Sequence, residues 1–237
     1  MPSAACQTVV MVRIAVVDHD ENEAVRLGRL GPFLAPHAQT SVFAPDGEFP
    51  VDVDAVVVLG GFMGAYDCDI HPWLETEKKW LVDLVDRDVP VLGICLGSQL
   101  LADALGGHAY LAEVPEVGVV DISLTPAGRD NPVAQGAGDV AFFAHQDTFE
   151  LPPGAVLLAE SNDYPAIFEM GSALAVQPHP ETPLDEALTW PDHPGFDMLE
   201  RVGLDRRQYE ADLRAHTQAL EKAANSIFGA WFAQLST

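Results

Sequence analysis

The sequence predicts an α/β fold in which an open, mostly parallel β-sheet is flanked by helices. Two observations support this prediction. Short continuous apolar runs, typical of buried parallel strands, alternate through the first half of the chain with segments of helical periodicity. Hydrophobic residues also make up 48% of the 237 residues, which is enough for a substantial core in one large domain. Such alternation places helices on both faces of a parallel sheet.

The first half of the chain supplies four of the expected strands and three helices. The strands are predicted at residues 13–18, 40–43, 54–59 and 89–94. The helices are predicted at residues 21–34, 73–86 and 98–105. In the second of these helices, WLETEKKWLVDLVD, the apolar residues gather on one face. The third is stopped by Gly106 and Gly107.

The second half contains shorter strands, separated by turns that are rich in proline and glycine. They are predicted at residues 117–124, 140–144, 156–160, 166–169 and 174–177. We expect them to extend the sheet and to add an antiparallel flap. The tail is helical again, with a stripe of apolar residues at three-, four- or seven-residue steps that should pack on the rest of the protein: Tyr209, Leu213, Leu220, Ala224, Ile227, Trp231 and Leu235.

These patterns divide the chain into three parts. Residues 1–10 precede Met11 and the first strand, and we expect them to form a loose leader. Residues 11–194 contain the alternating strands and helices of the main domain. Residues 195–237 form a C-terminal helical extension that packs on this domain.

Charge and cysteine content exclude several functional classes. The formal net charge is −24, from 36 acidic and 12 basic side chains. We therefore expect no nucleic-acid partner, which needs a positive surface, and no binding to an anionic membrane. The sequence has no signal-peptide pattern and no apolar run near the roughly 20 residues of a membrane span. Three cysteines without a CxxC pair fit a reduced, cytoplasmic protein.

Cys95 lies between two glycines in VPVLGICLGSQLLADALGG, where a predicted strand meets a predicted helix. A sharp turn at such a junction lifts the side chain clear of the sheet edge, as in a nucleophile elbow. Gly93 and Gly97 remove side chains that would clash across the turn, and the helix amino-terminus favours a thiolate. The N–H of Leu96 is placed to stabilise an oxyanion. The alternative is a buried cysteine that packs as a small hydrophobe.

A nucleophilic cysteine needs a base, and the base needs a group that orients it. The stretch ALAVQPHPETP places His179 just after the last predicted strand and Glu181 two residues later. In extended chain these two side chains point to the same side, so Glu181 can hold the imidazole while His179 meets Cys95. Taken alone, such an HxE pair is more often part of an ordinary loop, and its value comes from the pairing with Cys95.

Three further polar positions carry weaker signals. Residues 18–20, Asp-His-Asp, could be read as metal ligands, but a strand end and helix cap is the better interpretation. His145 follows an apolar strand and either lines the pocket or is a hydrogen-bonded structural histidine. Gly60 and Gly61 offer backbone N–H groups to a ligand or form a plain turn at a strand end. The sequence predicts neither a metal site nor a cofactor.

Five segments occur in order along the chain: VVLGGFMGAYD, HPWLETEK, PVLGICLGSQLLADALGG, FFAHQDTFELPPGAVLLAES and VQPHPE. Together they resemble the class I (triad) glutamine amidotransferase domain, and most closely its stand-alone GMP synthase-like members. The resemblance covers residues 13–181 and implies a flavodoxin-like fold. It also implies attack of a cysteine on the γ-carboxamide of glutamine, a γ-glutamyl thioester and release of ammonia.

The resemblance assigns roles to individual residues of this chain. The implied catalytic triad consists of Cys95, His179 and Glu181. The implied oxyanion hole consists of the backbone groups of Gly61 and Leu96. The implied substrate-binding residues are Gly60, Gln99, His145 and Gln146.

The chain departs from the family pattern at two positions. Pro178 replaces the usual aromatic residue before the motif histidine, and Gln146 replaces a glycine whose backbone approaches the bound glutamine. We therefore expect weak activity on free glutamine and better activity on a larger or cationic γ-glutamyl amide. No phosphate-cradling glycine loop of the SGGxDS kind is present, so we do not expect the chain to activate an ammonia acceptor alone.

Three functions remain open from the sequence. The favoured one is hydrolysis of the γ-carboxamide of glutamine or of a γ-glutamyl compound, with release of ammonia or an amine. The second is an ammonia-donating glutaminase subunit that needs a separate synthetase partner. The third is an inactive binding module with the same fold. A homodimer is compatible with all three.

Overall fold

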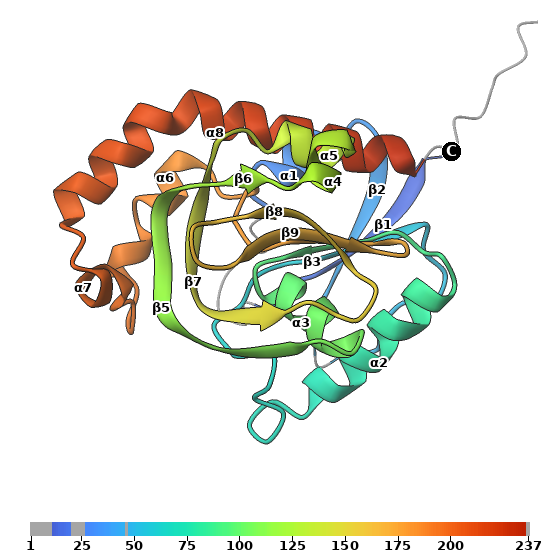
Figure 1. Ribbon diagram of the computed structural model, residues 1–237. Coiled ribbons are helices and arrows are strands. Elements are labelled where there is room, and N and C mark those ends of the chain that lie inside the picture. The colour runs from blue at the N-terminus through green and yellow to red at the C-terminus, as the bar shows by residue number, and fades with distance from the viewer. Residues whose placement is uncertain (1–10, 20–26, 46, 236–237) are drawn as a thin grey trace, which may run out of the picture.

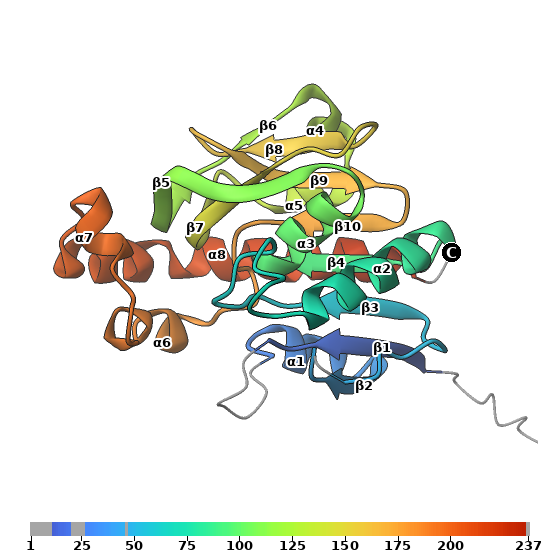
Figure 2. The same ribbon diagram turned by 90° about the horizontal axis from the view of Figure 1, so that it is seen from below.

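We describe the protein from a computed structural model, which places residues 11–19, 27–45 and 47–235. The leader predicted over residues 1–10 lies outside the described residues. Within them, eight strands form one sheet and two more form a second sheet (Figures 1 and 2). The predicted α/β class, with a mostly parallel sheet, flanking helices and additional antiparallel strands, is confirmed.

The large sheet has the strand order β2-β1-β3-β4-β10-β9-β8-β6. Its parallel part consists of β1 (Val12–Val17), β2 (Ala38–Phe43), β3 (Ala55–Val58), β4 (Val91–Ile94) and β10 (Ala173–Val176). The sheet continues as antiparallel strands through β9 (Pro165–Met170), β8 (Val156–Glu160) and β6 (Ser123–Leu124). Every residue of β3, β4 and β10 is buried, which explains why these strands are continuous apolar runs.

Helices cover both faces of this sheet and form two hydrophobic cores. One face packs against α1 (Leu30–Leu34), α5 (Pro132–Gly136) and α8 (Arg206–Gln234). The other face packs against α2 (Trp73–Asp86) and α3 (Leu96–Ala104). Strand β1 shows the division directly, since Ile14 and Val16 belong to the first core and Ala15 and Val17 to the second. Figure 1 shows α8 and α2 on opposite sides of the sheet.

The second sheet pairs β5 (His108–Asp121) with β7 (Val140–Glu150) in antiparallel fashion. Both strands are longer than the sequence predicted, and the predicted strand 117–124 is divided between β5 and β6. The reason is that β7 continues beyond Ala144 with the polar residues His145, Gln146, Asp147 and Thr148, which end the apolar run. The sequence did not predict α4 (Pro126–Asp130), α5, α6 (Leu184–Ala187) or the 3₁₀ helix η1 (Trp190–Asp192), whereas α7 (Met198–Val202) lies within the tail that was expected to be helical.

The helical stripe predicted for the tail is confirmed in α8. Its members Tyr209, Leu213 and Trp231 are almost completely buried, and the Tyr209 hydroxyl donates a hydrogen bond to the carbonyl of Ala187 at 2.7 Å. The tail thus packs against the remainder of the protein, although its treatment as a separate extension stays a prediction. None of the helices in the described part of the chain has the length and apolarity needed to cross a membrane.

The helix predicted over residues 21–34 needs correction where it can be assessed. Residues 20–26 lie outside the described residues, and the helix that follows spans only Leu30–Leu34. Gly28 interrupts it, because its φ of 47° is a left-handed conformation that glycine adopts freely. A Cβ at Gly28 would lie 2.0 Å from the carbonyl oxygen of Glu181. The turn therefore allows close contact with the loop that carries Glu181.

Candidate active site

The carboxyl ends of β1, β3, β4 and β10 meet at one edge of the large sheet, where open α/β folds bind their ligands. A cavity of about 420 Å³ opens there. Its lining contains predicted site residues from several distant segments: Gly60, Gly61, Cys95, Gln99, His145, Gln146, His179 and Glu181. The structure thus brings these predicted residues to one cavity, with Leu96 directly after Cys95 at the start of α3.

Cys95 sits on the predicted bend between β4 and α3. Its backbone has φ 51° and ψ −107°, a conformation that non-glycine residues rarely adopt and that often marks functional sites. Two glycines make the bend possible. A Cβ at Gly97 would lie 2.3 Å from the carbonyl oxygen of Val58, and one at Gly93 would lie 2.5 Å from the Gly97 carbonyl. The thiol is only slightly exposed, at 6% for the residue, and faces the cavity.

His179 and Glu181 form the hydrogen bond that the two-residue spacing predicted. The Nδ1 atom of His179 lies 2.7 Å from Oε1 of Glu181, which also accepts a hydrogen bond from the Thr182 hydroxyl. The Trp190 ring stands edge-on to the imidazole at a centroid distance of 4.8 Å. These contacts fix the ring from two sides, so its orientation is set before any ligand binds.

Gly60 shows how closely the bend and the histidine converge. A Cβ at Gly60 would lie 3.2 Å from Cε1 of His179 and 3.6 Å from Cβ of Cys95. The bare glycine backbone therefore packs against both residues. Among the described residues, Nε2 of His179 has no hydrogen-bond partner. Because Nδ1 is held by Glu181, Nε2 is the nitrogen available for proton exchange in the cavity.

The charge state of His179 follows from its surroundings. Burial lowers the pKa of His179, but its interactions with Cys95 and Glu181 outweigh burial and raise the pKa well above its usual value. The surroundings of the imidazole therefore favour its protonated form. This state suits a residue that delivers a proton to a leaving amine.

Two backbone N–H groups are placed near Cys95. Leu96 is the first residue of α3, so its N–H lies in the first helical turn, where helices have no internal acceptor. Gly61 follows β3, and a Cβ there would lie 2.7 Å from the Leu96 side chain. The two segments predicted to supply the oxyanion hole are therefore in contact. Their action on an oxyanion stays a prediction.

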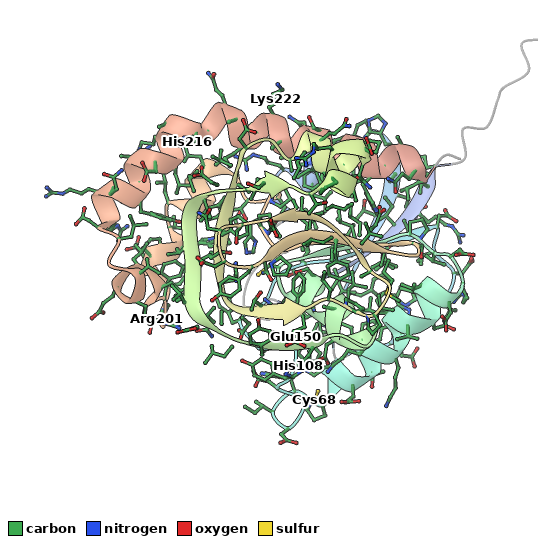
Figure 3. All side chains as sticks on the ribbon, viewed as in Figure 1. Cys68, His108, Glu150, Arg201, His216 and Lys222 are labelled. Carbon is green, nitrogen blue, oxygen red and sulfur yellow. The ribbon has the colours of Figure 1, made fainter. Side chains whose placement is uncertain are left out.

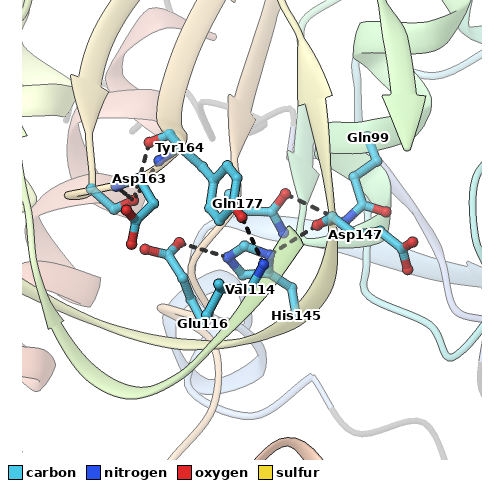
Figure 4. A network of polar contacts seen from close by, with 9 residues as sticks. Gln99, Val114, Glu116, His145, Asp147, Asp163, Tyr164 and Gln177 are labelled. Carbon is cyan, nitrogen blue, oxygen red and sulfur yellow. Dashed lines mark hydrogen bonds and ion pairs between the residues drawn. The ribbon is translucent and has the colours of Figure 1, made fainter. Parts of the chain in front are cut away.

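A buried polar network lies behind the cavity (Figure 4). The amide nitrogen of Gln99 donates to the Asp147 carbonyl at 2.9 Å and approaches Oε1 of Gln177 at 3.3 Å. Both ring nitrogens of His145 are also engaged, with the Asp147 carbonyl and with Glu116, each at 2.9 Å. Gln99 and His145 line the cavity, yet these polar atoms hold β7 in place. Their predicted contact with substrate remains untested.

Gln146 occupies an exposed position at the rim of the same cavity. Its amide oxygen accepts a hydrogen bond from Arg201 of α7 at 3.1 Å. Arg201 lies toward the periphery of the molecule (Figure 3). Gln146 thus connects β7 to the C-terminal region, a link that a glycine at this position could not make.

Sequence analysis missed the C-terminal wall of the cavity. Four side chains from residues 190–198 line this wall: Trp190, His193, Phe196 and Met198. They belong to no motif, and the only available signal was a cluster of aromatic and apolar residues in a segment rich in proline and glycine. The contact of the Tyr66 hydroxyl with Asp147 at 2.5 Å was missed because it joins two motifs that lie far apart in the chain.

Cys68 does not line this cavity, whereas Asp18 of the Asp-His-Asp triplet does. Cys68 precedes α2 at the edge of the molecule (Figure 3), and Cys6 lies outside the described residues. Of residues 18–20, Asp20 also lies outside them, and His19 is buried against Glu77. Across the residues with assigned positions, no group of three histidine, cysteine or acidic side chains could hold a metal ion.

Comparison with known proteins identifies the family of this chain. The family profile "Glutamine amidotransferase class-I" matches residues 32–189. The chain belongs to the class-I glutamine amidotransferase family. Among solved structures of the family, a glutamine amidotransferase from Thermotoga maritima superposes with a TM-score of 0.79 at 28% identity, covering 94% of this chain and 98% of that one. One from Methylobacillus flagellatus superposes with a TM-score of 0.80 at 25% identity, covering 94% and 95% of the two chains.

Curated relatives of this chain match over a shorter length. One subunit of a GMP synthase (glutamine-hydrolyzing) from Methanosphaera stadtmanae is 32% identical over 131 residues, which cover 53% of this chain and 64% of that protein. A GMP synthase (glutamine-hydrolyzing) from Helicobacter pylori is 34% identical over 130 residues, which cover 53% of this chain and 24% of that protein. The chain therefore spans less than two thirds of the curated relatives it matches.

Proposed function

We propose that this family member hydrolyses the γ-carboxamide of glutamine or of a γ-glutamyl compound through a cysteine thioester, releasing ammonia or an amine. The observation that carries the proposal is the meeting of Cys95, on its strained bend, with the buried His179–Glu181 pair across the backbone of Gly60. A buried structural cysteine needs neither the bend nor an oriented histidine. The same arrangement argues against an inactive binding module.

In the first half of the reaction the Cys95 thiolate attacks the γ-carbonyl carbon, and the carbonyl π electrons move to oxygen. The N–H groups of Gly61 and Leu96 stabilise this oxyanion. His179 then gives its Nε2 proton to the amide nitrogen as the C–N bond breaks. Ammonia or the amine leaves, and a γ-glutamyl thioester remains on Cys95.

In the second half water attacks the thioester, and His179 takes a proton from it. The oxyanion collapses, the C–S bond breaks and the thiolate is restored. Glutamate or the γ-carboxylate product leaves. Glu181 holds the ring throughout and stabilises its positive charge. No redox step or cofactor is required for this balance.

The experiment that tests the function is a screen of γ-glutamyl compounds with purified protein, scored by glutamate release. Free glutamine and γ-glutamyl amides of larger and cationic amines form the panel. Cys95→Ala should abolish all release, and Cys68→Ala is the matched control that should not. A glutamine-like electrophile should label Cys95 and spare Cys68. Release that survives in Cys95→Ala would refute the mechanism.

The second candidate is an ammonia-donating component of a larger assembly. It is favoured by the match to a protein named as one subunit of GMP synthase. In that case glutamine hydrolysis should be slow in the isolated chain and should rise when a synthetase partner is added, because the partner completes the site. Rapid glutamine hydrolysis by the isolated chain, unchanged by a synthetase, would favour the independent hydrolase.

A further inference from the structure

His19 and Glu77 form a completely buried pair next to Gly60 and Gly61, the residues whose backbone is predicted to contribute to the oxyanion hole. The Nε2 atom of His19 lies 3.2 Å and 3.1 Å from the two carboxylate oxygens of Glu77. Both side chains have no exposed surface. The His19 ring also stacks on Trp73 at a centroid distance of 5.7 Å and an interplanar angle of 25°. A strand end or helix cap needs none of these contacts.

The other ring nitrogen of His19 reaches the active site. Its Nδ1 lies 3.3 Å from the carbonyl oxygen of Gly60. Both nitrogens therefore face acceptors, which requires two N–H donors if Glu77 is ionised. Burial lowers the pKa of His19, but the charge and hydrogen bond of Glu77 outweigh burial, so the net shift is upward. The ring is thus suited to donate from both nitrogens at once.

The contact with Gly60 determines the direction of the Gly61 N–H. The Gly60 carbonyl and the Gly61 N–H belong to one planar peptide, and the described residues contain no cis peptide bond. In a trans peptide these two groups point in opposite directions. An N–H donor that holds the Gly60 carbonyl on the His19 side therefore turns the Gly61 N–H away from His19.

The two glycines make such a restraint necessary. A Cβ at Gly60 would crowd His179 and Cys95, and one at Gly61 would lie 2.9 Å from Cβ of His19. Side chains are thus excluded on both sides of the peptide. Glycine visits many backbone conformations at little cost, so the peptide between two glycines is poorly fixed by its own residues. An external hydrogen bond is the available means of holding it.

We propose that His19, held in place by Glu77, is a positioning residue that fixes the Gly60–Gly61 peptide so that the Gly61 N–H faces the oxyanion formed at Cys95. The proposal rests on the proposed function, because it assigns the support of that same site. His19 itself is not among the residues that line the cavity. It acts through a single carbonyl group.

Two amide variants separate this role from simple packing. The side-chain nitrogen of asparagine occupies the place of Nδ1 of histidine, and that of glutamine occupies the place of Nε2. His19→Asn therefore keeps the donor to Gly60, whereas His19→Gln keeps only the contact toward residue 77. Both variants carry Glu77→Gln, so that neither leaves an unpaired carboxylate in the interior. The two proteins have the same charge and differ by one methylene group.

We expect the variant with His19→Gln to have a kcat about tenfold to a hundredfold below that of the variant with His19→Asn, since loss of one oxyanion donor typically costs roughly 10²–10³. KM should differ little between them, because the effect is confined to the transition state. Alkylation of Cys95 by iodoacetamide forms no oxyanion and should proceed equally in both. Crystal structures should show the Gly60–Gly61 peptide reoriented or in two conformations only in the His19→Gln variant.

Equal kcat values in the two variants, with the same Gly60–Gly61 peptide in both crystal structures, would overturn the proposal. If kcat, KM and the rate of Cys95 alkylation changed equally in the two variants relative to the wild type, the proposal would also be overturned, because such changes would indicate a packing role. The failure of the proposed function looks different, since wild-type protein would then release no glutamate from any γ-glutamyl compound. In that event the crystal structures alone decide whether His19 fixes the peptide.

Discussion

The chemistry of single residues in this site depends on where protons are held. The Nδ1 atom of His179 is committed to Glu181, and its Nε2 faces the cavity that contains Cys95. The raised pKa of His179 results from opposing causes, since burial lowers it while the interactions with Cys95 and Glu181 raise it more strongly. Removing one negative group should therefore change both the titration of His179 and the rate of hydrolysis.

Glu181→Gln is expected to lower the pKa of His179, because the amide keeps the shape of the side chain and loses its charge. Activity should fall by roughly 10–10³ but remain above that of His179→Ala, which loses proton transfer altogether. Both effects are measured in one protein, by NMR titration of the histidine ring and by glutamate release. An unchanged His179 titration in Glu181→Gln would contradict the assignment of its charge partner.

Glu181→Gln should also change the free energy of unfolding in a pH-dependent way. A histidine whose pKa is higher in the folded state than its unfolded value of about 6.5 stabilises the fold fully below that pH. This contribution disappears as the pH rises through the folded pKa. The difference in free energy of unfolding between wild type and Glu181→Gln should thus be largest near pH 6 and shrink toward pH 9. A difference that grows with pH would contradict the upward shift at His179.

At the level of single residues, local motifs located the candidate reactive groups but not the buried contacts that hold the surrounding residues in place. Cys95 was predictable because the bend needs two glycines beside it in the sequence, and His179 with Glu181 because they are two residues apart. The partners of His19 and Tyr66 were not, since each contact joins residues far apart in the chain. Such contacts depend on the tertiary fold, which no local pattern encodes.

Among the structural elements, α3 must approach β3 closely to place Cys95 at the cavity. A Cβ at Gly97 would lie 2.3 Å from the Val58 carbonyl oxygen, which is backbone and cannot move aside. Gly229 in α8 provides the opposite case, since nothing lies within 4 Å of a Cβ placed there. The two glycines therefore give a matched pair of helical substitutions with opposite expected signs.

Gly97→Ala should lower the free energy of unfolding by about 1–3 kcal/mol through overpacking, and it should also reduce activity by displacing Cys95. Gly229→Ala should raise the free energy of unfolding by about 0.5–1 kcal/mol, since alanine is the better helix former. Chemical denaturation of both variants and the wild type measures these changes. Equal effects of the two substitutions would show that the close contact of α3 with β3 does not constrain residue 97.

A second connection between elements concerns substrate choice. Gln146 on β7 lies at the rim of the cavity and accepts a hydrogen bond from Arg201 on α7. Gln146→Gly should raise kcat/KM for free glutamine severalfold, because it removes bulk near the bound amino acid. Arg201→Ala is the control, since it removes the hydrogen bond to Gln146 and leaves the side chain of Gln146 in place. No gain in Gln146→Gly, together with rapid glutamine hydrolysis by the wild type, would refute tuning at this position.

The elements themselves were predictable in proportion to their burial. Strands β3, β4 and β10 are buried throughout, and their apolar runs located them within two residues. The pairing of β5 with β7 shifts in register between Leu111 and Glu116, and the first part of β5 gave no strand signal in the sequence. The short helices from α6 to α7 are stabilised by packing on β7 and α8 rather than by their own periodicity.

For the molecule as a whole, the dominant property is its charge of −24. Repulsion among surface carboxylates disfavours the compact state, and salt screens it over about 10 Å at 0.1 M. The melting temperature should therefore rise when sodium chloride is increased from about 0.01 M to 0.5 M. Differential scanning calorimetry measures this change, with an equal osmolarity of glycerol as the control for solvent effects. A melting temperature that falls with salt would contradict net repulsion.

Intact-protein mass spectrometry after rapid acid quenching shows whether Cys95 forms a γ-glutamyl thioester with the help of His179. Wild-type protein, Cys95→Ala and His179→Ala are mixed with the γ-glutamyl compound that the activity screen identifies as the best substrate. We predict a γ-glutamyl adduct that maps to Cys95 in the wild type, forms far more slowly in His179→Ala and is absent from Cys95→Ala. Glutamate release by the wild type without any adduct on Cys95, or an adduct that persists in Cys95→Ala, would contradict the account.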